Sequence, residues 1–220
     1  MSHDVDLLVL GGGMAGLSAA AWAVHQGRSV VLVEKGELGG SAARAGFIWT
    51  APSYDVLRSA IPDGDPELAE RLIEDFEPAV EWVRSLGVEV QPAVTVLRFG
   101  RGHQTSILNY LRACELAIRE DAGSELVLHG EAQRLLVEDG AVHGAEIRLP
   151  SGGLRVIRAP STLLATGGFQ GDPELRAALI HPQARDIPLR STGTAAATVS
   201  ASRAPQAHGS ALTTPVSTDT

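Results

Sequence analysis

Two short apolar runs flank an alanine-rich segment near the N-terminus. Residues 5–10 read VDLLVL and residues 29–34 read SVVLVE, which predicts two parallel strands that are buried on both faces. Between them, MAGLSAAAWAVHQG has apolar residues at helical spacing and ends at Gly27, a residue that commonly follows the last turn of a helix. The pattern therefore predicts a strand–helix–strand unit with parallel strands.

The middle of the chain is predicted to be a long loop followed by helices. Residues 35–53 are rich in Gly, Ser and Ala, which predicts an extended loop longer than a simple connector. Helical spacing predicts helices over residues 53–60, 66–85 and 104–121. In the second of these, Asp65 and Pro66 are typical of a helix start, and Pro78 is expected to kink or split the helix.

Strand patterns return in the last third of the chain. ELVLHG, EAQRLLVEDG and AVHGAEIRLP read as strands joined by Gly-containing turns, a three-stranded antiparallel meander near residues 124–158. STLLAT at 161–166 predicts a last apolar strand that ends at Gly167 and Gly168, and DPELRAALI predicts a short helix beyond it. The order of elements predicts an α/β fold, a doubly wound, Rossmann-like sheet with a small antiparallel insertion.

Composition and charge exclude several classes of function. Of the 220 residues, 44% are hydrophobic and 20% charged, which is ordinary for a globular protein that is not embedded in a membrane. The net charge of −8 argues against nucleic acid as a partner. Cys114 is the single cysteine and lies in a helical pattern, so we expect it to pack in the core. The N-terminus lacks a basic signal-peptide region and no run is long enough to span a membrane, so we expect a cytoplasmic location.

A glycine run follows the first predicted strand and opens the first predicted helix. Gly11, Gly13 and Gly16 satisfy G-x-G-x-x-G, and Glu34 stands at the end of the second strand, as in dinucleotide-binding folds. Gly11 allows a tight turn, Gly13 lets the backbone approach a pyrophosphate at the helix N-terminus, and Gly16 allows close packing of helix and strand. The alternative is a Gly-rich turn that binds no nucleotide.

The glycine run alone leaves NAD and FAD as alternatives. The loop after Glu34 places Gly39, Gly40, Ser41 and Gly46 where an extended cofactor would continue past its diphosphate. The sequence ATGGF adds two glycines at the carboxyl end of another strand, the end at which open α/β sheets bind ligands. Both features favour FAD.

Three segments in order, GGGMAG, VEKGELGGSAARAG and LLATGGFQGD, resemble the flavoproteins of the fumarate reductase and succinate dehydrogenase superfamily. The resemblance points to soluble FAD-dependent dehydrogenases of this superfamily, such as the 3-ketosteroid and tricarballylate dehydrogenases, and it runs from about residue 4 to about residue 193. The resemblance implies an oxidoreductase that transfers hydride between an organic substrate and N5 of FAD, together with an electron acceptor. The family attaches FAD covalently through a His in the loop at positions 43–50, which hold no His here, so the resemblance implies non-covalent FAD.

The resemblance also implies which residues hold the cofactor. They come from the glycine run, the end of the second strand, the loop behind it, the meander and the last strand: Gly11, Gly13, Met14, Ala15, Gly16, Glu34, Lys35, Gly40, Ser41, Ala42, Gly46, Ala132, Thr166 and Gly167.

Members of the family are usually far longer and carry a substrate-capping domain that has no counterpart in this sequence. The residues that bind substrate and move protons come largely from that domain, so no catalytic residue is identified. We expect residues 1–193 to form the FAD-binding domain and residues 194–220, rich in Ala, Ser, Thr and Pro, to be an irregular tail. Back-translation of residues 197–209, read one nucleotide upstream, can spell a family-like Gly-Asp-Gly continuation, and we hypothesise a frameshift near residue 195.

Two other outcomes stay open: a catalytically inert, truncated FAD-binding module, and an NAD-binding domain of another dehydrogenase. His103, flanked by Arg98 and Arg101, has two interpretations. These cations could face an anionic substrate or the flavin; the interpretation we favour is a solvated loop before the helix at 104–121.

Overall fold

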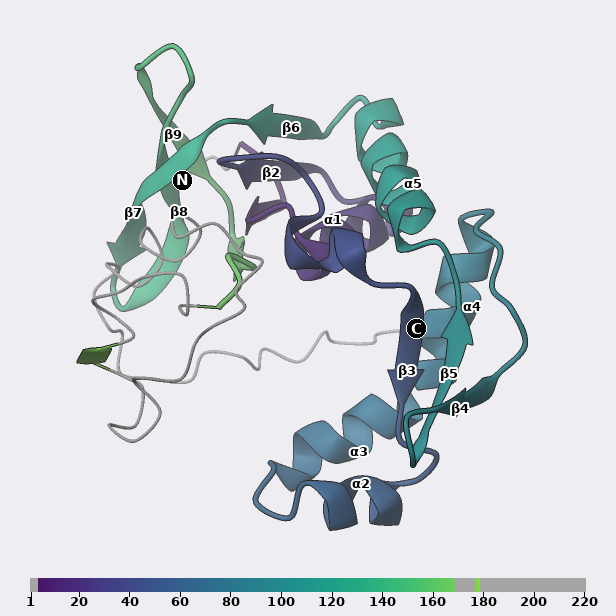
Figure 1. The fold of residues 1–220 in the computed structure, drawn as a ribbon. Coiled ribbons are helices and arrows are strands. Elements are labelled where there is room, and N and C mark those ends of the chain that lie inside the picture. The colour runs from purple at the N-terminus through teal and green to yellow at the C-terminus, as the bar shows by residue number, and fades with distance from the viewer. Residues whose placement is uncertain (1–3, 169–176, 179–220) are drawn as a thin grey trace, which may run out of the picture.

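A four-stranded parallel sheet forms the centre of the computed structural model, which describes residues 4–168 and 177–178 (Figure 1). The strands follow the order β10-β1-β2-β6, and every neighbouring pair is parallel. They are β1 (Leu7–Leu10), β2 (Val30–Glu34), β6 (Glu125–Leu128) and β10 (Ser161–Leu164). The predicted α/β fold with a parallel, dinucleotide-binding sheet is confirmed.

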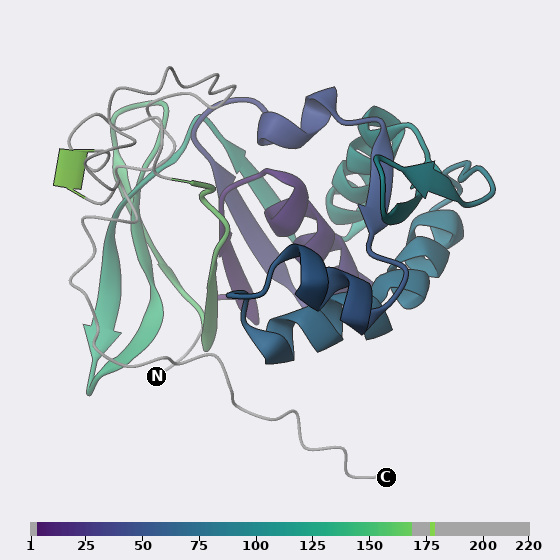
Figure 2. The ribbon, with the colours of Figure 1, turned by 60° about the horizontal axis from the view of Figure 1, so that its bottom comes forward.

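Helices α1 (Met14–His25) and α5 (Ile107–Glu120) lie against each other on one face of this sheet (Figure 2). β1 and β2 are largely buried on both faces, as their continuous apolar runs predict, whereas β10 at the edge of the sheet is partly exposed. Along β1, Val9 packs with the helices, whereas Leu8 and Leu10 pack in a separate core on the opposite face. This alternation follows from the opposite directions of successive side chains in a strand.

The antiparallel meander covers that second face, on the far side of the parallel sheet from α1 and α5 (Figure 2). Its strands are β7 (Glu131–Glu138), β8 (Ala141–Arg148) and β9 (Leu154–Arg158), in that order. Ile147 and Ile157 point from it into the core beneath the sheet. The second covering layer of the described residues is therefore a sheet rather than helices.

The first strand of the predicted meander belongs to the parallel sheet instead. ELVL forms β6 and pairs in parallel with β2, with Glu125 opposite Val31 and Leu128 opposite Glu34. It follows α5, so the chain returns to the parallel sheet through a helical crossover before the meander begins. The insertion starts at Glu131, not near residue 124.

The segment predicted as an extended loop contains regular structure. It holds the short 3-10 helix η1 (Gly40–Arg44) and strand β3 (Phe47–Thr50). β3 pairs with β5 (Gly100–Gln104), which also pairs with β4 (Val94–Val96), in a second antiparallel sheet. Sequence patterns missed this sheet because β5 contains two glycines, and glycine is depleted in strands. Both glycines lie against the Trp49 side chain, where a Cβ would clash.

The predicted helix over 66–85 is split in two. α2 (Tyr54–Ala60) precedes it, and Asp75 separates α3 (Pro66–Glu74) from α4 (Phe76–Ser85). A proline ring conflicts with the carbonyl four residues earlier, and for Pro78 that residue is Glu74, the last of α3. The predicted effect of Pro78 is confirmed.

Cys114 is 0% exposed in the core between α1 and α5, as predicted.

The short helix expected in DPELRAALI lies outside the described residues apart from the helical positions 177 and 178. The expected domain boundary at residues 193–194 also lies outside them. No helix in the described ranges is long and apolar enough to cross a membrane.

Candidate functional site

The glycine run leaves the sheet at the carboxyl end of β1, between its two neighbouring strands. The N–H of Gly11 donates to the carbonyl of Val33 at 2.8 Å, and the N–H of Ala165 donates to the carbonyl of Leu10 at 2.8 Å. The ends of β1, β2 and β10 are therefore tied together where a ligand of an open α/β sheet is expected to lie.

Two of the glycines have no room for a side chain. Gly11 has a φ of 109°, and a Cβ on it would lie 2.3 Å from the carbonyl oxygen of Ala165. A Cβ on Gly16 would lie 1.8 Å from the carbonyl oxygen of Gly11. The tight turn and the close helix approach predicted for these positions are both present.

Gly13 has a different environment, because a Cβ there would meet nothing within 4 Å. It is the N-cap of α1, and the first helical hydrogen bond runs from the N–H of Leu17 to the carbonyl of Gly13 at 2.9 Å. The N–H groups of Met14, Ala15 and Gly16 precede that bond and so have no partner within α1. An open approach to a helix N-terminus favours an anion such as a diphosphate.

The loop after β2 returns to the glycine run. Gly39 donates its N–H to the carbonyl of Gly12 at 2.8 Å and forms an isolated parallel bridge with Gly13. A Cβ on Gly40 would lie 3.5 Å from the Cα of Gly13. The structure thus brings together the first two of the three segments that carry the family resemblance.

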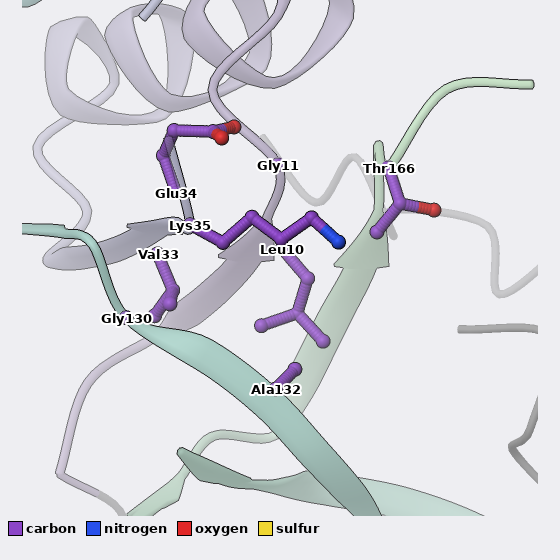
Figure 3. A pocket seen from close by; sticks show the side chains of 8 residues that line it. All are labelled: Leu10, Gly11, Val33, Glu34, Lys35, Gly130, Ala132 and Thr166. Carbon is purple, nitrogen blue, oxygen red and sulfur yellow. The ribbon is translucent and has the colours of Figure 1, made fainter. Parts of the chain in front are cut away.

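An open pocket lies at the ends of these strands (Figure 3). Its lining residues are Leu10, Gly11, Val33, Glu34, Lys35, Gly130, Ala132 and Thr166. Five of them are predicted site residues that come from four separate segments: Gly11, Glu34, Lys35, Ala132 and Thr166. The other predicted residues are not part of this lining: Gly13, Met14, Ala15, Gly16, Gly40, Ser41, Ala42, Gly46 and Gly167.

Sequence reasoning missed three residues of the lining. Leu10 and Val33 are at the carboxyl ends of β1 and β2, a position that would have identified them. Gly130 follows β6, and its N–H donates to the carbonyl of Glu34 at 3.1 Å. No local signal marks Gly130, because its place depends on the pairing of β6 with β2.

Two charged side chains face this region. Lys35 crosses the pocket toward Thr166, whereas the carboxylate of Glu34 is turned toward the glycine run (Figure 3). Partial burial lowers the pKa of Lys35 below the ordinary value of a lysine, against the opposing effect of the carboxylates of Glu131 and Glu34. Lys35 thus contributes a partly buried cation to the lining of the pocket.

The sites of Ser41, Ala42 and Gly46 lie further along the loop. Ser41 and Ala42 belong to η1, and Gly46 is exposed just before β3. The carbonyl of Gly46 accepts the N–H of Thr105 at 3.2 Å, which ties the loop to the end of β5. Gly167 is also exposed, with a φ of 81°, beyond β10.

The interpretation of His103 as part of a solvated loop is wrong. His103 lies in β5, is 4% exposed, and its Nδ1 is 2.7 Å from the carbonyl of Gln91. Because a carbonyl only accepts, Nδ1 carries the proton. Arg101 pairs with Glu77 of α4 at 3.1 Å. His103 is thus a core residue that joins β5 to the segment before β4.

Comparisons with known proteins agree with this geometry. A family model described as an FAD binding domain matches residues 6–218. A vinyl phenol reductase of Lactiplantibacillus plantarum is 29% identical over 87% of this chain and 43% of its own length. A urocanate reductase of Eggerthella lenta is 31% identical over 80% of this chain and 34% of its own length.

Solved structures share the fold. The open conformation of a flavocytochrome c3 fumarate reductase matches with a TM-score of 0.68 at 25% identity, over 84% of this chain and 37% of that one. A 3-ketosteroid dehydrogenase of Rhodococcus jostii matches with a TM-score of 0.67 at 20% identity, over 80% of this chain and 48% of that one. The chain spans less than half the length of these four proteins.

The fold and site define a flavoprotein of the dinucleotide-binding class. The open side of Gly13 and the free N-terminus of α1 fit the diphosphate of the cofactor. The chain belongs to the FAD binding domain family, within the fumarate reductase and succinate dehydrogenase flavoproteins, and FAD is its cofactor. Members of this family are FAD-dependent oxidoreductases.

Proposed function

We propose that this chain is the FAD-binding part of an oxidoreductase that transfers hydride between a small organic substrate and N5 of a non-covalently held FAD. The observation that carries the proposal is the pocket at the ends of β1, β2 and β10, beside the N-terminus of α1. Four segments that are distant in the sequence supply residues to it, as expected of a purpose-built ligand site. The proposed domain comprises residues 1–193.

The diphosphate is assigned to the N-terminus of α1. There the N–H groups of Met14, Ala15 and Gly16 and the helix dipole favour negative charge, and the open side of Gly13 lets the backbone approach. Gly40, Ser41 and Ala42 are assigned to the diphosphate and flavin because Gly40 lies beside Gly13.

The adenosine half is assigned to the pocket. The Glu34 carboxylate accepts from the ribose hydroxyls, while Lys35 and the backbone of Ala132 border the adenosine. Thr166 and Gly167 border the cofactor from β10, and Gly46 borders the flavin ring. Bound FAD supplies the acceptor or donor of hydride, and these residues bind and orient it.

The names of two relatives support reduction of an organic substrate, since one is a vinyl phenol reductase and the other a urocanate reductase. An electron donor or acceptor completes the cycle. Non-covalent attachment rests on the absence of His from positions 43–50.

Release of the flavin tests the mode of binding. The full chain is purified, denatured with acid and passed through a membrane that retains protein. We expect the yellow colour and a flavin identified by mass as FAD in the filtrate. Flavin that stays on the polypeptide would overturn non-covalent binding, and a colourless protein that does not take up added FAD would overturn the site itself.

A second candidate is an inert FAD-binding module. Anaerobic spectroscopy separates the two. The bound flavin is reduced with dithionite and mixed with urocanate, fumarate or a vinyl phenol in turn. Reoxidation faster than in the buffer control supports catalysis, whereas a bound flavin that none of these compounds reoxidises supports the inert module.

A further inference from the structure

Glu34 makes two hydrogen bonds that recognition of a ribose does not require. Its Oε2 accepts the N–H of Gly12 at 2.7 Å, and its Oε1 accepts the N–H of Gly36 at 2.7 Å. Both are short bonds to an ionised acceptor, the stronger class of hydrogen bond in proteins. One side chain therefore joins the glycine run after β1 to the first turn after β2.

Gly12 is held from its other side as well. Its carbonyl accepts the N–H of Gly39 at 2.8 Å. A Cβ on Gly12 would lie 3.0 Å from the Cβ of Glu34 and 2.5 Å from the side chain of Leu38. The glycine run therefore packs directly against these two side chains. Residues 11–13 and 34–40 consequently form one hydrogen-bonded unit with Glu34 at its centre.

We propose that Glu34 is a positioning residue that holds the glycine run in its diphosphate-binding shape before FAD arrives. Without the Gly12 bond, a backbone N–H in a partly buried loop loses its acceptor, and the loop gains alternative conformations. Ordering a flexible loop on binding costs free energy and so lowers the affinity. A loop that is already ordered before FAD binds avoids this cost.

This role is compatible with the ribose contact assigned above and goes beyond it. A carboxylate has about four lone-pair sites. Two of them are used by Gly12 and Gly36, so two remain for hydroxyl donors. Glu34 can thus hold the loop and accept from the ribose at the same time.

The test begins with the full chain freed of FAD. Glu34→Gln keeps the shape of the side chain but replaces one accepting oxygen with a donor. Glu37→Gln is the matched control, because Glu37 lies three residues further along, its side chain is 88% exposed, and within the described part of the chain it forms an ion pair with His129 at 3.8 Å. Hydrogen exchange is measured for the amides of Gly12 and Gly36 by NMR.

In the apoprotein, Glu34→Gln is expected to speed exchange at one or both of these amides about tenfold or more, the consequence of losing one charge-assisted bond. Exchange in Glu37→Gln and in the buried strand β1 is expected to match the wild type. Unchanged exchange at Gly12 and Gly36 would overturn the proposal. Glu34→Asp, which keeps the charge but is one methylene shorter, provides the same test if the Gln variant does not fold.

Binding of ADP and 2′,3′-dideoxy-ADP to the apoprotein separates positioning from ribose recognition. The dideoxy compound has no ribose hydroxyls, so a carboxylate that only recognises ribose would leave its affinity unchanged in Glu34→Gln. We expect that affinity to fall about tenfold. Removal of a negative charge favours an anionic ligand, so charge cannot produce this loss. Equal dideoxy-ADP affinity in wild type and Glu34→Gln would overturn the positioning role, whatever activity the flavin later shows.

Discussion

The carbonyl oxygen of Gly11 lies where a side chain on Gly16 would begin, 1.8 Å from the position of a Cβ. Gly16→Ala therefore cannot be accommodated unless α1 moves away from the turn, since the obstacle is backbone rather than a flexible side chain. We expect the variant to lose roughly 3 kcal/mol of stability, at the upper end of overpacking costs. Urea unfolding followed by circular dichroism measures the loss.

Gly13→Ala is the matched counterpart, three residues earlier in the same turn. A Cβ at Gly13 meets nothing within 4 Å, and its φ of −78° with ψ of −169° is open to any residue. We expect its unfolding midpoint without cofactor to match the wild type, but its affinity for FAD to fall about tenfold or more because the methyl group occupies the approach to the diphosphate. Wild-type affinity for FAD would remove Gly13 from the proposed site.

The contrast between these glycines shows what the sequence could predict. The fingerprint depends on local spacing, and strand, turn and helix follow one another within residues 7–25. The tight turn at Gly11, with its φ of 109°, and the close helix approach at Gly16 are confirmed, and both belong to this local segment. Ala132 reached the prediction only through family resemblance, whereas Thr166 belongs to ATGGF, which the sequence already places at the carboxyl end of a strand.

Elements that depend on distant pairing were mispredicted. β3 and β5 are separated by about fifty residues, and Gly100 and Gly102 remove the β-branched signal that a strand needs. Because strand β5 was not predicted, His103 was assigned to a solvated loop. A histidine in a loop is expected in solvent, whereas one in a strand can be buried. The bonds from Glu34 to Gly12 and Gly36 could not be predicted either, since a carboxylate at the end of β2 already has an explanation in the ribose.

Tyr110 joins three helices through its hydroxyl group. It donates to Oγ of Ser18 in α1 at 2.7 Å and accepts from Nε1 of Trp82 in α4 at 3.3 Å. Tyr110→Phe is expected to cost about 1–2 kcal/mol of stability, because the Trp82 N–H loses its acceptor in a largely buried site. Urea unfolding measures the cost. Tyr54→Phe is the control at an exposed tyrosine and should stay within about 0.5 kcal/mol of the wild type; equal losses in both variants would contradict the network.

The buried thiol of Cys114 predicts a loss of stability at alkaline pH. Burial raises the pKa of Cys114 to about 11 from an ordinary value of 9.0, and burial likewise raises the pKa of Tyr110 to about 12. Above pH 9 the unfolded chain releases the thiol proton while the folded chain retains it, so the unfolded state binds fewer protons and stability falls as pH rises. The contribution is complete below pH 9 and is lost between about pH 9 and pH 11.

Cys114→Ala isolates this effect. The variant is expected to be less stable than the wild type at pH 7, because it leaves a small cavity in the core. Between pH 9 and pH 11, however, its unfolding free energy should fall less steeply, by about 1 kcal/mol per pH unit at most. Chemical unfolding at a series of pH values gives both slopes, and their difference cancels the cost of the cavity. Parallel slopes would show that the thiol titrates alike in the folded and unfolded chains, contrary to its burial between α1 and α5.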